Sequence, residues 1–488
     1  MKKIIPAQDE FIKIKHRGKI YTPDYLVNII LNQGNYVPGN INKKHVIDNS
    51  CGDGQFIIHV VDRYCKDFLL NSNDKNTLKK ELETYIHAIE IDKDELALCT
   101  KRCNILAKMY GIHGVNWDFL NEDALKVTEF DNKMDFVVGN PPYVRVHNLL
   151  ENFNSVKDFS FATKGMTDLF IVFYEIGIKM MNQNGKLAYI TPSSFFTSVA
   201  GQKLRDCLIK MNLLESVCDL KHFQPFNATT YTTIICLNKN KPSCVKYYEF
   251  DGEKSVPVFI DTLSAEDFVI KDSFYFSTKS NLKKLKDILT ETAKVDISVK
   301  NGYATLADKV FINDFSFDSK YIIPVIKASR GKWTKIFYPY DKKANLVPED
   351  CLQKESELFK YLKDNKGALL KRSNERDADK YWYSFGRSQA LKDTFKEKIA
   401  INTLIKKDSQ LKIEKSPAGT GVYSGLYIIS DTFDYNTIKE VLADKDLNTF
   451  ISLLGKYKSG GHYTFSTKDI QKYLNHKLKT KITDKINA

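Results

Sequence analysis

The sequence predicts an α/β domain followed by a second domain of the α+β class. Strand-like apolar runs alternate with amphipathic stretches from about residue 20 to residue 240, which is typical of a parallel sheet covered by helices on both faces. This alternation stops after Lys239-Asn240-Lys241-Pro242. At 488 residues, the chain is also too long for one hydrophobic core. We therefore expect two domains, residues 1–245 and residues 246–488.

The first predicted strand, residues 45–48, ends at Asp48 and leads into a turn that contains Gly52 and Gly54. Glycine lets the backbone turn tightly and approach a ligand closely. An amphipathic helix follows over residues 57–68. The third glycine of a dinucleotide fingerprint is missing, so this turn alone does not predict a dinucleotide site.

Acidic residues follow the next two predicted strands. Residues 86–92 form the second strand, where Glu90 could accept hydrogen bonds from two ribose hydroxyls and Ile91 could pack on an adenine. Residues 117–119 end the third, where Asp118 could accept from an adenine amine and Phe119 could wall the ring. A single acid at such a position more often caps the next helix. The prediction depends on several suitable strand ends in the right order.

The fourth predicted strand, residues 134–139, leads into the most informative motif, Asn140-Pro141-Pro142-Tyr143. The Asn140 side-chain oxygen and the Pro141 carbonyl can each accept one N–H of an aromatic amine. The prolines fix the backbone and offer no competing N–H. Tyr143 offers a flat face for a stacked base. An ordinary strand exit could also contain two prolines, but in open α/β sheets ligands bind at the carboxyl ends of strands.

The order of these motifs resembles that of the γ class of adenine-specific DNA amino-methyltransferases, the TaqI-like group. The resemblance covers most of the chain and is specific for its first half. It implies a Rossmann-like sheet of the class I S-adenosylmethionine-dependent methyltransferases and a C-terminal target-recognition domain. It also implies that the predicted strands 215–220 and 231–237 form the reversed hairpin that closes such a sheet.

The resemblance assigns site residues. The cofactor-binding residues that it implies are Tyr21, Thr22, Pro23, Asp48, Ser50, Cys51, Gly52, Gly54, Glu90, Ile91, Asp118, Phe119, Asn140 and Pro142. The catalytic residues that it implies are Asn140, Pro141, Pro142 and Tyr143, with Phe226 as a second stacking aromatic. Spacing to the last strand favours Phe226 over Phe223, although either could belong to the core. The family usually has proline where this chain has Asn49, so the local turn is expected to differ slightly.

The second half is more basic than the first. The net charge is +13, of which residues 1–250 carry +3 (31 Lys and Arg against 28 Asp and Glu) and residues 251–488 carry +10 (42 against 32). This asymmetry favours a polyanionic partner of the second half. Clusters of cations with aromatics or glycines there, including Arg376, suggest DNA contacts, although a wet surface with buried aromatics is equally expected. The residues selected are Lys327, Arg330, Lys332, Arg372, Trp382, Arg387, Gln389, Lys458, Gly460 and Gly461.

Other features limit the cofactors and the compartment. The nine cysteines form no CxxC pair and no zinc pattern, so we expect reduced thiols and no metal. No apolar stretch approaches the ~20 residues that span a bilayer, and the N-terminus has no signal-peptide core. We expect a cytoplasmic, nucleoid-associated monomer without a membrane partner.

We therefore expect a site-specific DNA methyltransferase that transfers a methyl group from S-adenosylmethionine to a flipped-out adenine of double-stranded DNA. Methylation of RNA or of a protein glutamine remains an alternative, because similar motifs occur in those enzymes. A non-catalytic DNA-binding subunit is a third. The sequence leaves open whether a separate restriction endonuclease accompanies the protein.

Overall fold

The computed structural model describes residues 21–146, 156–163, 165–226, 230–372 and 381–486, with side chains as far as residue 479. Arg376 lies outside the described residues. The chain divides into two compact units, Met1–Lys283 and Lys284–Ala488. This division lies later than the boundary expected near residue 245, because two further strands join the first sheet. With the observed division, the first unit carries +1 (35 Lys and Arg against 34 Asp and Glu) and the second +12 (38 against 26).

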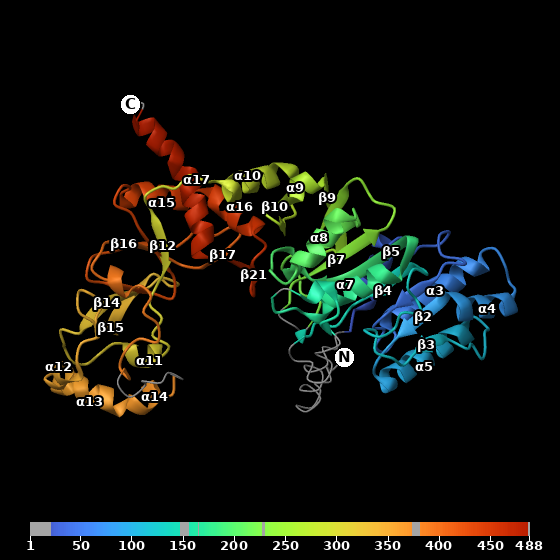
Figure 1. Ribbon diagram of the computed structural model, residues 1–488, viewed down its shortest axis with the longest axis horizontal. Coiled ribbons are helices and arrows are strands. Elements are labelled where there is room, and N and C mark those ends of the chain that lie inside the picture. Colours follow the sequence, from blue (N-terminus) through green and yellow to red (C-terminus); the bar gives the residue numbers. More distant parts are fainter. Residues whose placement is uncertain (1–20, 147–155, 164, 227–229, 373–380, 487–488) are drawn as a thin grey trace. The chain divides into compact units, whose positions relative to one another are not determined.

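The first unit is built on a nine-stranded sheet in the order β3-β2-β1-β4-β5-β7-β6-β8-β9 (Figure 1). Pairing is parallel from β3 to β5 and antiparallel on both sides of β7, so the predicted reversed hairpin of β6 and β7 is present. The strands are β1 (Val46–Asp48), β2 (Ile86–Ile89), β3 (Asp118–Leu120), β4 (Met134–Gly139), β5 (Met181–Pro192), β6 (Leu214–Asp219), β7 (Thr232–Asn238), β8 (Val245–Asp251) and β9 (Val256–Leu263).

Helices cover both faces of this sheet because its strands alternate apolar side chains between two cores. Val137 and Leu187 face one core with α7 and α8, whereas Val138 and Ala188 face the other with α2, α3, α4 and α5. A sheet buried on both faces gives the near-continuous apolar runs seen in the sequence. The helices of this unit are α2 (Asp24–Gln33), α3 (Gln55–Leu69), α4 (Lys75–Tyr85), α5 (Lys93–Met109), α7 (Leu169–Met180), α8 (Gln202–Lys210) and α9 (Ala265–Phe268), with the 3₁₀ turns η2 (Ser160–Ala162) and η3 (Ser193–Phe196).

Strands β8 and β9 explain the later boundary. β8 pairs in parallel with β6, and β9 pairs antiparallel with β8. A small hairpin of β10 (Val269–Ile270) and β11 (Ser273–Phe274) follows, and α10 (Lys279–Thr290) runs across the division between the units. Phe268 and Phe274 lie in the same core as α7, so this segment is part of the first unit.

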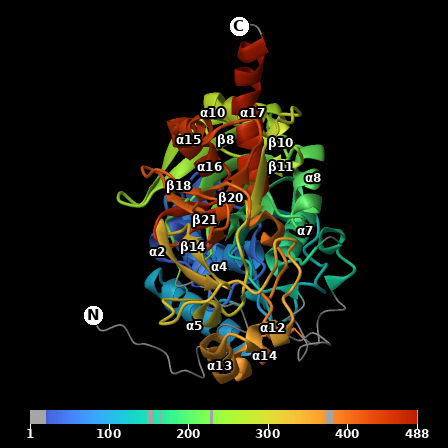
Figure 2. The same cartoon turned by 90° about the vertical axis from the view of Figure 1, so that its left-hand side faces the viewer.

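The second unit is of the α+β class, with three small sheets in the orders β12-β20-β16-β18, β13-β15-β14-β19 and β17-β22-β21. Within it, α12 to α14 lie at one end and α15 and α16 at the other (Figures 1 and 2). Its strands are β12 (Ser298–Asn301), β13 (Ile312–Asn313), β14 (Ile322–Lys327), β15 (Lys332–Phe337), β16 (Lys398–Ile401), β17 (Leu404–Lys406), β18 (Ile413–Ser416), β19 (Gly421–Tyr423), β20 (Leu426–Ile429), β21 (Tyr457–Lys458) and β22 (His462–Thr464). Its helices are α11 (Asp308–Phe311), α12 (Glu349–Gln353), α13 (Ser356–Asp364), α14 (Lys366–Leu370), α15 (Tyr435–Ala443), α16 (Lys445–Leu453) and α17 (Thr467–Ile486), with the 3₁₀ turn η4 (Leu391–Asp393).

Candidate active site

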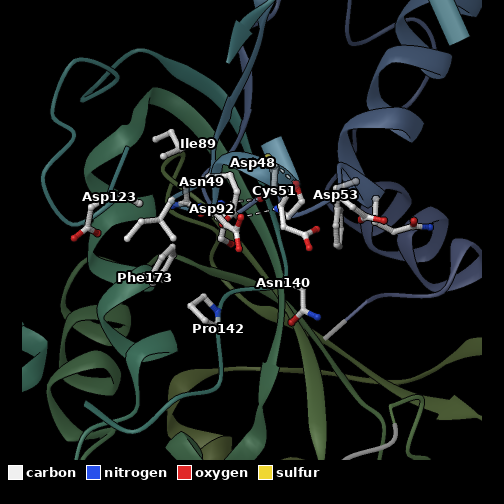
Figure 3. A pocket seen from close by; sticks show the side chains of 18 of the residues that line it. Asp48, Asn49, Cys51, Asp53, Ile89, Asp92, Asp123, Asn140, Pro142 and Phe173 are labelled. Carbon is white, nitrogen blue, oxygen red and sulfur yellow. Dashed lines mark hydrogen bonds between the residues drawn. The ribbon is translucent and has the colours of Figure 1, made fainter. Parts of the chain in front are cut away.

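A pocket of about 630 Å³ opens at the carboxyl ends of β1, β2 and β4 (Figure 3). This is the edge at which ligands bind in open α/β sheets, and the volume suits a nucleoside-sized ligand. The lining residues come from six segments: Tyr21 and Thr22, Asp48 to Asp53 with Gln55 and Phe56, Ile89 to Glu95, Glu122 to Leu125, Asn140 with Pro142 and Val144, and Leu169 with Phe173.

The loop after β1 forms one wall of the pocket. Asp48 is almost fully buried, and its Oδ1 accepts a hydrogen bond from the Ser50 backbone N–H at 3.0 Å. Gly54 has a left-handed φ of 87°, and a Cβ there would lie 2.5 Å from the Cys99 Sγ. Both the left-handed φ and the close approach to Cys99 therefore require glycine at position 54. The buried Ser50 hydroxyl oxygen has no hydrogen-bond partner within the described part of the chain, so it is a candidate ligand contact.

Glu90 joins this loop to the end of β2. Its Oε2 accepts the Gly52 N–H at 2.9 Å, and its Oε1 accepts the Asp92 N–H at 2.9 Å. Each carboxylate oxygen has two lone pairs, so Glu90 can still accept from ribose hydroxyls. The predicted ribose-binding acid thus lines the pocket and also holds its wall in place. Ile91 lines the pocket as well and is exposed, as a residue that packs on a ligand ring would be.

The structure contradicts the positions expected for Asp118 and Phe119. Asp118 begins β3 rather than ending it, and its Oδ2 lies 2.6 Å from the Nδ1 of the buried His87. Phe119 stacks on Trp117, and neither Asp118 nor Phe119 is among the residues that line the pocket. The sequence interpretation ended the strand too early, because Leu120 still pairs with Ile89.

Asp123 follows β3 and, unlike Asp118, lines the pocket. Its Oδ1 accepts the Leu125 N–H at 3.0 Å, whereas its buried Oδ2 has no hydrogen-bond partner among the described residues. A buried acceptor without a partner is costly, so a bound ligand donor is the expected partner. The signal available in the sequence was Asn121-Glu122-Asp123, a polar run directly after Leu120.

The Asn140-Pro141-Pro142-Tyr143 motif lies where the sequence analysis expected it, directly after β4. Asn140 and Pro142 line the pocket and lie together in Figure 3, whereas Pro141 is buried and is not among the lining residues. The Asn140 Nδ2 donates to the Thr22 Oγ1 at 3.1 Å. The Tyr143 hydroxyl donates to the Ile190 carbonyl oxygen at 3.0 Å, which fixes the tyrosine ring near the C-terminal end of β5.

Phe226 lies closer to the motif than Phe223 does. The Phe226 and Tyr143 rings are nearly perpendicular, with centroids 6.4 Å apart. Phe223 is partly buried and packs on Phe250 of β8, with centroids 4.7 Å apart, whereas Phe226 is 9% exposed and belongs to the hydrophobic core. The choice of Phe226 as the second stacking aromatic stays a prediction, and its ring contact with Tyr143 is what supports it.

The pocket is strongly acidic. Two of its carboxyls add little net charge, because burial raises the pKa of Asp48 well above its ordinary value and the Arg102 guanidinium contacts Asp53 at 2.5 Å, but six others line the pocket as well. Such a lining disfavours an anionic ligand and favours a cationic one such as a sulfonium. Eight carboxyl side chains line the pocket against the single cation Lys93: Asp48, Asp53, Glu90, Asp92, Asp94, Glu95, Glu122 and Asp123.

Two of the predicted DNA contacts serve the core of the second unit instead. The Arg372 guanidinium donates to the carbonyl oxygens of Leu369, Thr305, Trp382 and Ser384 at 2.6–3.0 Å. Trp382 is only 2% exposed and lies in a hydrophobic core. Neither side chain is available to DNA in this arrangement, because the residues around Trp382 fold inward as a buried aromatic cluster.

The remaining predicted contacts are more accessible. Gln389 is partly buried and donates to the Gly302 carbonyl oxygen at 2.5 Å. Gly460 and Gly461 have φ of 71° and 74° in the turn between β21 and β22, so both positions favour glycine. Exposed or partly exposed side chains are Lys327, Arg330, Lys332, Arg387 and Lys458.

Two general features of the described residues bear on the expected partners. No group of three or more His, Cys, Asp or Glu side chains in the described part of the chain is arranged to hold a metal ion. None of the described helices is both long and apolar enough to cross a membrane.

Comparison with known proteins relates the chain to restriction-modification enzymes. Residues 57–226 match the Eco57I restriction-modification methylase family. The type II restriction enzyme and methyltransferase RM.Eco57I of Escherichia coli is 24% identical over 93% of this chain and 56% of that protein. The type II methyltransferase M.AccI of Acinetobacter calcoaceticus is 26% identical over 68% of this chain and 61% of that protein. The chain thus spans little more than half the length of these relatives.

Solved structures confirm the predicted fold class. The type IIL restriction-modification enzyme MmeI, solved in complex with DNA, has a TM-score of 0.62 at 15% identity and covers 94% of this chain and 64% of its own. A nuclease-deletion mutant of the type ISP enzyme LlaGI, solved with a DNA substrate mimic, has a TM-score of 0.54 at 11% identity, over 95% of this chain and 47% of its own. Both likenesses extend over the second unit as well as the first.

Proposed function

We propose that this protein is an S-adenosylmethionine-dependent DNA methyltransferase that methylates the exocyclic amine of adenine. The observation that carries the proposal is the position of Asn140 and Pro142 in an acidic, nucleoside-sized pocket at the carboxyl end of β4. The relationship to the Eco57I methylase family and to DNA methyltransferases of restriction-modification systems supports it.

The pocket residues suit S-adenosylmethionine, which supplies an activated methyl group when bound. Glu90 would accept hydrogen bonds from the ribose, and the unpartnered Asp123 Oδ2 would accept from the adenine amine. The acidic lining would favour the sulfonium cation over an anionic cofactor. Tyr21, which lines the pocket together with Thr22, would face the methionine part.

Catalysis in this proposal is mostly positioning of the target amine. The Asn140 Oδ1 and the Pro141 carbonyl oxygen would each accept one N–H, which draws the nitrogen lone pair out of conjugation with the ring as it attacks. Tyr143 would stack on the base, with Phe226 as the second aromatic residue that contacts it. The N–CH₃ bond would form as the sulfonium–CH₃ bond breaks, which leaves a neutral thioether, and the amine would lose its extra proton to solvent after the transfer. The proposal therefore requires no general base before the step, and positioning of the amine supplies several kcal/mol of the lowered barrier.

The target base must leave the duplex, since its amine is paired and its ring is stacked. We propose that the second unit binds the duplex. It carries a net charge of +12, whereas the first unit carries only +1. Lys327, Arg330 and Lys332 at the β14–β15 hairpin are the first candidates for phosphate or base contacts, because their side chains are exposed or partly exposed.

The test is methyl transfer from labelled S-adenosylmethionine to DNA, RNA and protein. We expect labelled N6-methyladenine in double-stranded DNA, and roughly a 10²-fold lower turnover for Asn140→Ala with cofactor binding retained. Label in RNA or in protein glutamine would support the alternative enzymes, and label in N4-methylcytosine would overturn the adenine assignment. The absence of any transfer from a protein that binds DNA would support a non-catalytic subunit.

Two further proposals concern partners and location. Since M.AccI is a type II methyltransferase, we propose a separate restriction endonuclease as a partner of this chain, and pull-down from the native host would test it. We also propose that the protein acts as a cytoplasmic monomer on bacterial DNA. Light scattering with and without a target duplex would test the oligomeric state.

A further inference from the structure

We propose that Thr22 is a positioning residue that fixes the orientation of the Asn140 side-chain amide. The sequence analysis assigned Thr22 only to the cofactor. This inference rests on the proposed function, because it concerns the catalytic role given to Asn140. It adds that the segment before α2 takes part in orienting the acceptor for the target amine.

The contact that carries the inference joins residues that lie 118 positions apart in the chain. The Asn140 Nδ2 donates to the Thr22 Oγ1 at 3.1 Å, and Thr22 is only 3% exposed. Engaging the amide nitrogen leaves the amide oxygen as the group that can accept from a substrate amine. An asparagine side chain rotates readily about its last torsion, and half a turn would present two donors to a substrate that itself donates. The contact, in which the hydroxyl is the acceptor, therefore holds the amide in the productive orientation.

Thr22 can do this because the chain that follows it is anchored to two helices, α2 and α3. Pro23 follows it, restricts its backbone conformation and is the N-cap residue of α2. Asp24, the next residue, contacts α3 through Gln55 and through the His59 Nε2 at 3.1 Å. Helix α3 in turn starts directly after the pocket loop that contains Gly54. The hydroxyl is thus presented to Asn140 from the same rigid frame that forms the pocket wall.

The test compares Thr22→Val with Thr22→Ser in the full-length protein. Valine keeps the shape of threonine but removes the acceptor, whereas serine keeps the hydroxyl. We expect Thr22→Val to lower the methyl-transfer rate constant at saturating cofactor and DNA about tenfold, the scale of one lost hydrogen bond. We expect Thr22→Ser to stay within about threefold of wild type. The dissociation constant for S-adenosylmethionine, measured by calorimetry, should change by less than about threefold in both.

Thr233→Val is the matched control. Thr233 is fully buried, and its Oγ1 donates to the Cys218 carbonyl oxygen at 3.0 Å between β6 and β7. It does not line the pocket. The same chemical change there should lower the melting temperature without lowering the rate constant of the folded enzyme. A similar rate loss in Thr22→Val and Thr233→Val would show that lost stability, rather than lost orientation, causes the effect.

A double-mutant cycle separates this inference from the proposed function. If Thr22 acts through Asn140, Thr22→Val should have no further effect on the rate in the Asn140→Ala background. Additive losses, or equal losses in rate and cofactor affinity, would mean that Thr22 serves the cofactor directly and would overturn the inference alone. A normal rate in Thr22→Val beside an inactive Asn140→Ala would do the same. A wild-type protein that transfers no methyl group would overturn both proposals.

Discussion

Exchanging Asp123 for asparagine tests which acid after β3 binds the cofactor. Asparagine keeps an oxygen for the Leu125 N–H, which Asp123 Oδ1 now accepts at 3.0 Å. The second oxygen, Oδ2, becomes an NH₂ group that would meet the adenine amine donor to donor. Losing one hydrogen bond and leaving buried donors unpaired costs about 1–3 kcal/mol. We therefore expect S-adenosylmethionine to bind Asp123→Asn roughly 5- to 150-fold more weakly.

Asp118→Asn is the control for this experiment. Asp118 contacts His87 at 2.6 Å, does not line the pocket and has a side chain that is 40% exposed. We expect cofactor affinity to stay within about twofold, with at most ~1 kcal/mol lost from the free energy of unfolding. Calorimetric titration with S-adenosylmethionine gives the affinities, and thermal unfolding gives the stabilities. Weaker binding by Asp118→Asn, with unchanged binding by Asp123→Asn, would refute the reasoning and restore the original assignment.

Two further predictions concern cations and pH. In DNA binding measured over a range of salt, Arg330→Gln should reduce the slope of log K against log salt by about one if Arg330 meets a phosphate. Arg372→Gln should leave that slope unchanged and should destabilise the fold by roughly 2–3 kcal/mol, since four carbonyl contacts depend on the guanidinium; a changed slope with normal stability would contradict this. Burial lowers the pKa of His87 and also the pKa of His45, which lies beside it. The folded state therefore binds fewer protons than the unfolded state just below pH ~6.5, so stability should fall on acidification from that pH. In thermal melts between pH 8 and pH 5, His87→Gln should flatten this dependence, and an unchanged dependence would exclude His87 as its source.

The sequence predicted the first unit well because its signals are local. Continuous apolar runs define the strands, and Gly54 and Pro141 occupy turns whose geometry their own chemistry imposes. The same logic failed at β3, where the true strand end depends on the pairing of Leu120 with Ile89 across the sheet. That pairing has no counterpart in the local pattern, so Asp123 was passed over in favour of Asp118.

The second unit shows why cation clusters are harder to interpret. Arg372 and Arg330 look alike in the sequence, since each lies near aromatic residues. Their surroundings differ because tertiary packing brings four carbonyl groups around Arg372, whereas Arg330 is exposed at a hairpin turn. The domain boundary was hard to predict for the same reason. The local sequences of β8 and β9 contain no feature that assigns these strands to the first sheet rather than to a second one.

Glu90 both lines the pocket and accepts two backbone N–H groups, which affects the choice of substitution for an inactive variant. A substitution at Glu90 would remove a ligand contact and, in the same step, release the backbone of Gly52 and Asp92. Any phenotype would then mix lost chemistry with a loosened loop. Asn140 donates to a side-chain hydroxyl, that of Thr22, so changing it leaves the Glu90 contacts to these two backbone amides in place. Genetic studies that need a catalytically silent but otherwise intact protein should therefore alter Asn140 and leave Glu90 untouched.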